Sequence, residues 1–235
     1  MVESKATTAE DGLRGPLLPR RGARLVLATE FTALYVVVPI GLWFAREHFA
    51  SMIVPTLLAL AAVFTVILLT DRRFDRRRLW NAQAFGDGLR RILRILVPST
   101  VVLTVLTWWL EPELFVRFPR ETPRMWLAVM LAYPLLSVYP QELIFRTFLF
   151  HRYRALFPGD RALVAASALA FGLAHLFFAN WLAPVLSTAG GWLFARTYLR
   201  SRSTLQATVE HGLWGDVIFT VGLGWYFYGG SIVAQ

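Results

Sequence analysis

The amino-acid sequence predicts an all-α protein, a polytopic bundle of about seven membrane-spanning helices. Apolar residues make up 56% of the 235 positions, and charged residues make up 17%, against roughly 25% in a typical soluble domain. Mainly apolar runs of about 20 residues, long enough to cross a bilayer, recur along the chain. These observations exclude an ordinary soluble enzyme. The absence of cysteine also excludes disulfides, thiolate metal ligands and a cysteine nucleophile.

The apolar runs give the order of the predicted elements. Residues 1–24 form a polar tail without the short apolar core of a signal peptide. Only the segment around residues 46–50 separates the first two spans, so they are expected to form a tight antiparallel hairpin. Residues 111–124 are too polar and too rich in proline to span, and we expect them at the membrane interface. The predicted spans are 25–46, 51–70, 92–110, 125–150, 162–180, 182–199 and 204–228.

Basic residues predict the orientation of the bundle. Loops facing the cytoplasm carry an excess of Lys and Arg. If the N-terminus is inside and the C-terminus outside, the cytoplasmic segments contain 19 basic residues and the opposite side contains 4. The net charge of +9 is thus assigned to topology and to contact with anionic lipid, not to nucleic acid. We expect a multi-pass protein of the inner or plasma membrane. The cytoplasmic segments are 1–24, 71–94, 151–161 and 196–203.

Several ionisable residues lie inside the predicted spans, where each costs at least about 2.5–3.5 kcal/mol to insert. Such residues need a partner or a function. All but one fall in the second half of the chain, which points to a site there. They are Glu30, Glu142, Arg146, His175, Glu210, His211 and Asp216.

Each of these residues also has a purely structural interpretation. Glu142 and Arg146 are four apart and share one helical face, so they can form a self-neutralising buried ion pair. His175 follows Phe171 by one turn and can be a packing residue. Taken together, however, His175, His211 and Glu142 come from three different spans. Two imidazoles and a carboxylate suit water attack on a carbonyl, with the water activated either by the carboxylate or by a divalent metal such as zinc held by these three side chains. Ser137 and Ser187 have no motif that would favour a serine nucleophile.

The order of motifs in this part of the chain resembles that of the CPBP family, the CAAX-processing and bacteriocin-processing (Abi, glutamic-type) intramembrane proteases. The matching residues are Gln141, Glu142 and Arg146 in Q-E-x-x-x-R, then Phe171 and His175 in F-x-x-x-H, and then His211. The resemblance covers about residues 125–220. It implies an endopeptidase that hydrolyses a peptide bond of a membrane-associated protein or peptide. It also implies a division into variable spans over 25–124 and core spans over 125–228.

The resemblance implies site residues as well. A motif Glu activates the water, the His of the second motif assists, and the last His with an Asn one turn later stabilises the oxyanion. Glu142, His175 and His211 are the predicted catalytic residues. The supporting residues are Gln141, Arg146, Phe171, Glu210 and Asp216.

Three positions depart from the family pattern. Gln141 stands where the first motif Glu is expected, and glutamine cannot act as a base. Glu142, Glu210 or Asp216 must then activate the water, or the protein is a catalytically silent scaffold or immunity-type relative. Thr147 replaces a small residue, and Gly215 replaces the Asn. Losing one oxyanion donor typically costs about 100- to 1000-fold in rate. A transporter would instead predict repeat symmetry between the halves, which the sequence lacks.

Overall fold

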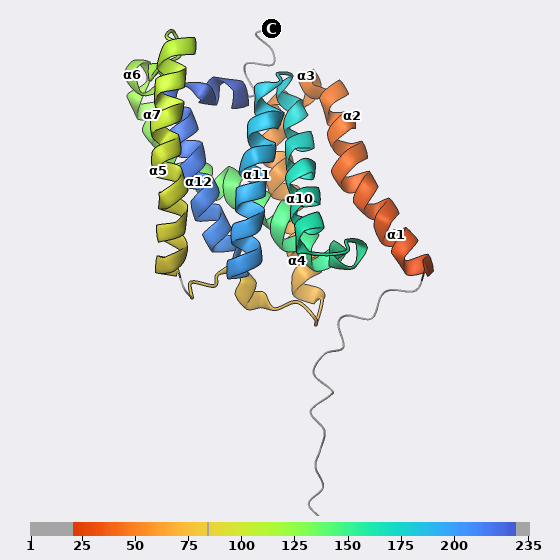
Figure 1. Ribbon diagram of the computed structural model, residues 1–235. Coiled ribbons are helices and arrows are strands. Elements are labelled where there is room, and N and C mark those ends of the chain that lie inside the picture. The colour runs from red at the N-terminus through yellow and green to blue at the C-terminus, as the bar shows by residue number, and fades with distance from the viewer. Residues whose placement is uncertain (1–20, 84, 229–235) are drawn as a thin grey trace, which may run out of the picture.

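The computed structural model describes residues 21–83 and 85–228, and within these ranges the protein is helical and contains no strand (Figure 1). The all-α prediction is confirmed. Residues 1–20 of the predicted tail lie outside the described residues. Residues 21–24 were assigned to that tail, but they form the first turn of helix α1, because the apolar run that follows continues the helix back to Arg21.

The first part of the chain forms three long helices. Only Ala45 separates the first two, so the connection between them is as short as the sequence predicted. The third ends in an exposed pair, Trp108 and Trp109, which is typical of a membrane–water interface. The elements are α1 (Arg21–Thr32), η1 (Ala33–Val37) and α2 (Val38–Phe44), then α3 (Arg46–Phe49), η2 (Ala50–Met52) and α4 (Ile53–Thr70), and, after the turn η3 (Arg76–Leu79), α5 (Phe85–Leu110).

The second part of the chain supplies most of the buried residues. One long, irregular helix crosses the bundle first, and α10, α11 and α12 pack together beside it (Figure 1). The irregular helix comprises α7 (Pro123–Tyr133), η4 (Pro134–Val138), α8 (Tyr139–Glu142), η5 (Leu143–Phe148), α9 (Leu149–Tyr153) and η6 (Arg154–Leu156). The others are α10 (Asp160–Ala174), η7 (His175–Phe178), α11 (Leu182–Ser201), α12 (Thr204–Val221) and η8 (Leu223–Phe227).

Five of the described helices are long and apolar enough to cross a membrane. They cover Arg21–Phe44, Arg46–Thr70, Phe85–Leu110, Pro123–Leu156 and Asp160–Phe178. The last two predicted spans are present as α11 and α12 but are not in this set. Both helices carry polar residues toward the interior, and the buried Glu210 and His211 lower the mean hydropathy of α12. A total of seven spans therefore stays a prediction.

The segments assigned to the cytoplasm gather at one end of the bundle. The start of α1, the connection from α4 to α5, the start of α10 and the turn from α11 to α12 all lie at the lower end in Figure 1. Hydrogen bonds join two of these segments: Asn81 Nδ2 donates to the carbonyl of Ser201 over 3.2 Å, and Ser203 Oγ donates to the carbonyl of Asn81 over 2.6 Å. Most of the described basic residues thus lie at a single end, although the direction in which that end faces stays a prediction.

Residues 111–122 lie at the opposite end, where they contain the short helix α6 (Arg117–Glu121). The segment is fastened to the end of α12 by the Val116 amide, which donates to the carbonyl of Val221 over 3.2 Å. Helix α12 stops at Gly222, whose φ is +115°, and a Cβ there would overlap the carbonyl of Leu114. Only glycine satisfies both requirements.

Two π-helical stretches, η4 and η5, interrupt the irregular helix on either side of α8. Pro134 and Pro140 lack the backbone N–H of a regular helix, which favours such departures. Backbone carbonyls in the second stretch receive hydrogen bonds from neighbouring helices. Tyr35 Oη donates to the carbonyl of Ile144 over 2.8 Å, and Ser167 Oγ donates to that of Phe145 over 2.7 Å. Wide turns of this kind are frequent at functional sites, and here they set the direction of Glu142.

Candidate active site

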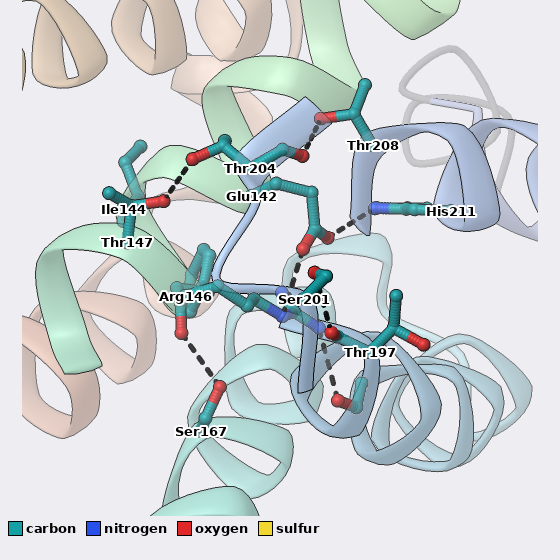
Figure 2. Close-up of polar contacts among 12 residues, drawn as sticks. Glu142, Ile144, Arg146, Thr147, Ser167, Thr197, Ser201, Thr204, Thr208 and His211 are labelled. Carbon is teal, nitrogen blue, oxygen red and sulfur yellow. Dashed lines mark hydrogen bonds and ion pairs between the residues drawn. The ribbon is translucent and has the colours of Figure 1, made fainter. Parts of the chain in front are cut away.

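Glu142 lies at the centre of the buried polar residues, with no exposed surface. Figure 2 shows its carboxylate pointing between Arg146 and His211. Oε1 lies 2.8 Å from His211 Nδ1, and Oε2 lies 3.2 Å from Arg146 Nε. The ion pair predicted from the i, i+4 spacing is therefore present, and the same carboxylate also holds an imidazole from a distant helix.

Arg146 is as deeply buried as Glu142, and aromatic faces surround it. Its guanidinium carbon lies 4.3 Å from the centre of the Phe171 ring and 5.4 Å from that of Phe194. Nη2 donates to the carbonyl of Gly191 over 3.4 Å. Cation–π contacts and one charged partner compensate for part of the cost of burying this cation.

His211, on α12, is held from three sides. Phe194 stacks on the imidazole with ring centres 4.4 Å apart, and Phe171 meets it edge-on at 5.4 Å. Because the carboxylate of Glu142 can only accept, Nδ1 must donate to it. In the neutral imidazole, Nε2 then carries the lone pair, and Tyr133 Oη lies 3.3 Å from this atom.

His175, at the start of η7, is fixed by its own helix. Its Nδ1 lies 2.7 Å from the carbonyl oxygen of Phe171, which can only accept. Nδ1 is therefore the donor here too, and Nε2 is left as an acceptor. The Phe171 ring contacts both imidazoles, lying 4.5 Å from His175.

A cavity of about 480 Å³ opens beside these residues. Most of its lining is apolar. Both histidines and Gln141 are part of the wall, and Gln141 Nε2 donates to Ser137 Oγ over 2.8 Å. Among the described residues, no Asp or Glu lines this cavity. Its lining includes Val102 and Leu103 from α5, Tyr133 from α7, Leu186, Gly190 and Leu193 from α11, and Trp214 and Gly215 from α12.

The three carboxylates that the sequence offers as bases differ in their position relative to the cavity. Glu142 contacts the cavity only through His211. Glu210 is buried near Arg146 and Glu142, its Oε2 has no hydrogen-bond partner, and it does not line the cavity. Asp216 is half-buried, and it too lies outside the lining. The histidines, Gln141, Arg146 and Phe171 thus come together around Glu142, whereas Asp216 lies outside the cavity lining.

Two residues of the site were missed in the sequence, Tyr133 and Phe194. Tyr133, Ser137 and Gln141 follow one another at intervals of four, and this polar stripe is a signal that could have revealed Tyr133. No comparable signal exists for Phe194, because an aromatic residue in an apolar helix is normally a packing residue.

The described donor set does not fit a catalytic zinc ion. Such sites use three protein ligands, and no group of three or more His, Asp or Glu side chains that could hold a metal occurs in the described part of the chain. Glu142, the third predicted ligand, is already engaged by His211 Nδ1 and Arg146. Of the three predicted ligands, only the Nε2 atoms of the two histidines remain free to bind a metal ion.

Comparison with known proteins agrees with this geometry. Residues 123–215 match the family model for type II CAAX prenyl endopeptidases, described as Rce1-like. This segment is Rce1-like. The match confirms the family resemblance found in the sequence motifs for this segment. The described helices that are apolar enough to cross a membrane agree with a membrane protein. No match was found among curated proteins or among solved structures.

The Rce1-like segment contains the polar residues that meet around Glu142 and the two histidines that line the cavity, from Tyr133 on α7 to His211 on α12. It begins at the first residue of α7 and ends at Gly215, within α12. Helices α1 to α4 contribute no lining residue to the cavity, and α5 contributes one apolar wall.

Proposed function

We propose that this protein is a membrane-embedded endopeptidase of the CAAX type, which hydrolyses a peptide bond of a membrane-associated protein or peptide. One observation carries the proposal. A buried carboxylate orients an imidazole that lines an apolar cavity, with Glu142 Oε1 at 2.8 Å from His211 Nδ1. A carboxylate–imidazole pair is a recurring device for activating a nucleophile. The family match supplies the reaction class.

In the proposed mechanism Glu142 acts through His211, which serves as the base and not in the oxyanion role that the family resemblance implied for it. A water molecule in the cavity loses a proton to His211 Nε2 while its oxygen bonds to the scissile carbonyl carbon, and the carbonyl π electrons move onto oxygen. Glu142 stabilises the resulting imidazolium through Nδ1–H. When the oxyanion collapses, the C–N bond breaks and the leaving amine takes the proton from Nε2. Direct proton removal by Glu142 is less favoured, because its carboxylate does not line the cavity.

His175 and Gln141 would hold the water and the substrate. Nε2 of His175 is an acceptor, because Nδ1 donates to the carbonyl of Phe171. The Gln141 amide is fixed by Ser137 and offers a carbonyl oxygen and a further N–H at the cavity wall. Both groups can form hydrogen bonds with the attacking water and so position it.

Cleavage in membranes tests this proposal. Membranes from cells expressing the full chain are compared with membranes containing His211→Ala, and new protein termini are identified by mass spectrometry. A farnesylated Cys-a-a-X peptide, with a fluorophore and a quencher on either side of the bond after the cysteine, serves as a defined probe. We expect products that require His211.

A native protein that yields no product in either assay would contradict the proposed activity. If Gln141→Glu then restored cleavage, the silent-scaffold alternative would replace it, since the fold would be intact and only the first motif residue missing. His175→Ala provides a second inactive comparison, on a different helix.

The orientation and location of the bundle belong to the proposal as well. We propose a cell membrane, plasma or inner, with the N-terminus and the basic end in the cytoplasm, where arginines of the 71–94 connection meet anionic headgroups. A reporter that is active only in the cytoplasm, fused after residue 85, is expected to give signal, and the same reporter after residue 113 is not. The reverse pattern would contradict this orientation.

A further inference from the structure

We propose that the hydroxyl of Tyr133 donates the hydrogen bond that stabilises the oxyanion of the tetrahedral intermediate. This role rests on the proposed hydrolysis and adds a catalytic residue to it. Tyr133 ends α7, immediately before the π-helical stretch η4, and it lines the same cavity as His175 and His211.

The contact between Tyr133 and His211 fixes the direction of the hydroxyl proton. Oη lies 3.3 Å from Nε2, the nitrogen that carries the lone pair when Nδ1 donates to Glu142. The phenol must therefore be the donor. At 3.3 Å this hydrogen bond is long for an O–H donor, so the proton can transfer its hydrogen bond to a stronger acceptor at small cost.

A negatively charged carbonyl oxygen is such an acceptor. The attacking water must sit within hydrogen-bonding distance of Nε2, and the carbonyl carbon that it attacks lies directly beyond it. Tyr133 Oη is already next to Nε2, so it can reach the oxygen that gains charge in this attack. Donors placed where charge develops act mainly on the transition state, because the neutral carbonyl of the substrate is a weaker acceptor.

Gly215 provides the space that this arrangement needs. A Cβ at residue 215 would lie 2.8 Å from both Cζ and Oη of Tyr133 and closer still to Cε1. One turn earlier on α12, a Cβ at Gly212 would lie 3.5 Å from Pro134, which is ordinary contact. The lack of a side chain at Gly215 therefore admits the Tyr133 ring, and Phe219 supports that ring edge-on at 5.2 Å.

Other donors in the lining are less suited to this role. The indole nitrogen of Trp214 is fully buried, with no surface open to the cavity. The amide nitrogen of Gln141 donates to Ser137. Tyr133 is the donor whose hydroxyl is held at the nitrogen that would activate the water.

The test compares Tyr133→Phe with Tyr139→Phe, in the full chain reconstituted in vesicles, using the farnesylated peptide described above. Tyr139 stacks on Trp80 and does not line the cavity, so its variant controls for loss of a phenol hydroxyl in the same long helix. We expect Tyr133→Phe to lower kcat about 10²- to 10³-fold and to leave KM nearly unchanged, as for removal of one oxyanion donor. Tyr139→Phe should keep the native kcat, and both variants should keep the native thermal midpoint.

A second pair of variants tests the space at residue 215. Gly215→Ala should lower kcat by displacing the ring, whereas Gly212→Ala should not. Gly215→Ala should add little to the loss already present in Tyr133→Phe, because the hydroxyl is then absent. Additive losses would show that the two residues act separately, contrary to the proposal.

The outcomes also separate this inference from the proposed function. If Tyr133→Phe keeps kcat within about threefold while His211→Ala abolishes cleavage, the donor role is wrong and the hydrolase stands; a loss of one oxyanion donor would be far larger. If native protein and His211→Ala give the same products, both proposals fail.

Discussion

Two of the glutamate–arginine pairs in the described part of the chain differ sharply in burial, one in the interior and one near the basic end. Glu142 and Arg146 are completely buried, and the second carboxylate oxygen holds His211. Glu30 and Arg152 form a better hydrogen-bonded pair, with contacts of 2.8 and 3.0 Å and a third from Tyr153 Oη at 2.7 Å. Their side chains are nevertheless 27% and 45% exposed.

The two pairs show that geometry alone does not decide what an ion pair contributes. Near the surface, solvent screens both charges, and a pair such as Glu30–Arg152 stabilises by about 0–1 kcal/mol. In the interior, loss of either partner leaves a charge without compensation, which costs about 3–5 kcal/mol. The interior pair also lies next to a cavity, so a change there alters the imidazole that faces it.

The largest difference is expected in activity, from the same substitution at both glutamates. Glu142→Gln should lower cleavage about 10³- to 10⁴-fold, because an amide cannot stabilise the His211 imidazolium, as for the orienting carboxylate of a catalytic triad. Glu30→Gln should leave kcat unchanged. Cleavage of the farnesylated peptide by vesicle-reconstituted protein measures both. Full activity in Glu142→Gln would show that another group activates the water.

The next difference is expected in stability, from removing the arginines. Arg146→Ala should lower the free energy of unfolding by about 3–5 kcal/mol, since it leaves Glu142 buried without a cation and empties the space between Phe171 and Phe194. Arg152→Ala should lower it by about 1 kcal/mol or less. Titration of the detergent-solubilised variants with a denaturing detergent measures this difference, and equal losses would refute the proposed effect of burial.

The smallest effect on stability is expected at a third polar contact, between Asp71 and His151 at the basic end. Asp71 Oδ2 lies 2.8 Å from His151 Nε2. The backbone amide of Arg73, and next His151, lower the pKa of Asp71 below its ordinary value of 3.8. A lowered pKa in the folded state contributes stability that is present above pH 3.8 and is lost as pH falls through the lowered value.

Asp71→Asn should therefore lower the thermal midpoint slightly at pH 7, and the difference from the native protein should disappear in acid. The exposed Asp87→Asn, at a 3.5 Å contact with Arg90, serves as the matched control. A difference that grows on acidification would contradict the assigned cause.

Comparison with the sequence separates local features from those that need the assembled bundle. The segment predicted at 182–199 is a helix, α11, Leu182–Ser201, and the span predicted at 51–70 lies within Arg46–Thr70. Helix positions could be predicted because bilayer thickness requires long apolar runs, which are visible in a single segment. The Glu142–Arg146 pair was predictable for a similar reason, since i, i+4 residues meet on any helix.

The tertiary structure decided which of the predicted residues face the cavity. Glu142 was expected to take the water proton directly, yet its carboxylate lies behind His211, and the neighbouring Gln141 lines the cavity instead. The π-helical stretches η4 and η5 change the rotation of the helix on either side of α8, so the ideal 100° per residue could not predict this direction.

The origin of the site shows the same division between what the sequence determines and what the tertiary structure decides. Residue types and their order by themselves determined that this is a helical membrane protein with an Rce1-like motif set in its second half, because composition, apolar length and short spacings are properties of the chain. Only the packing of α7 against α12 brought Tyr133 to His211 and placed its ring over Gly215. Residues 78 positions apart in the chain meet because buried helices must interlock without voids, and that condition depends on the whole bundle.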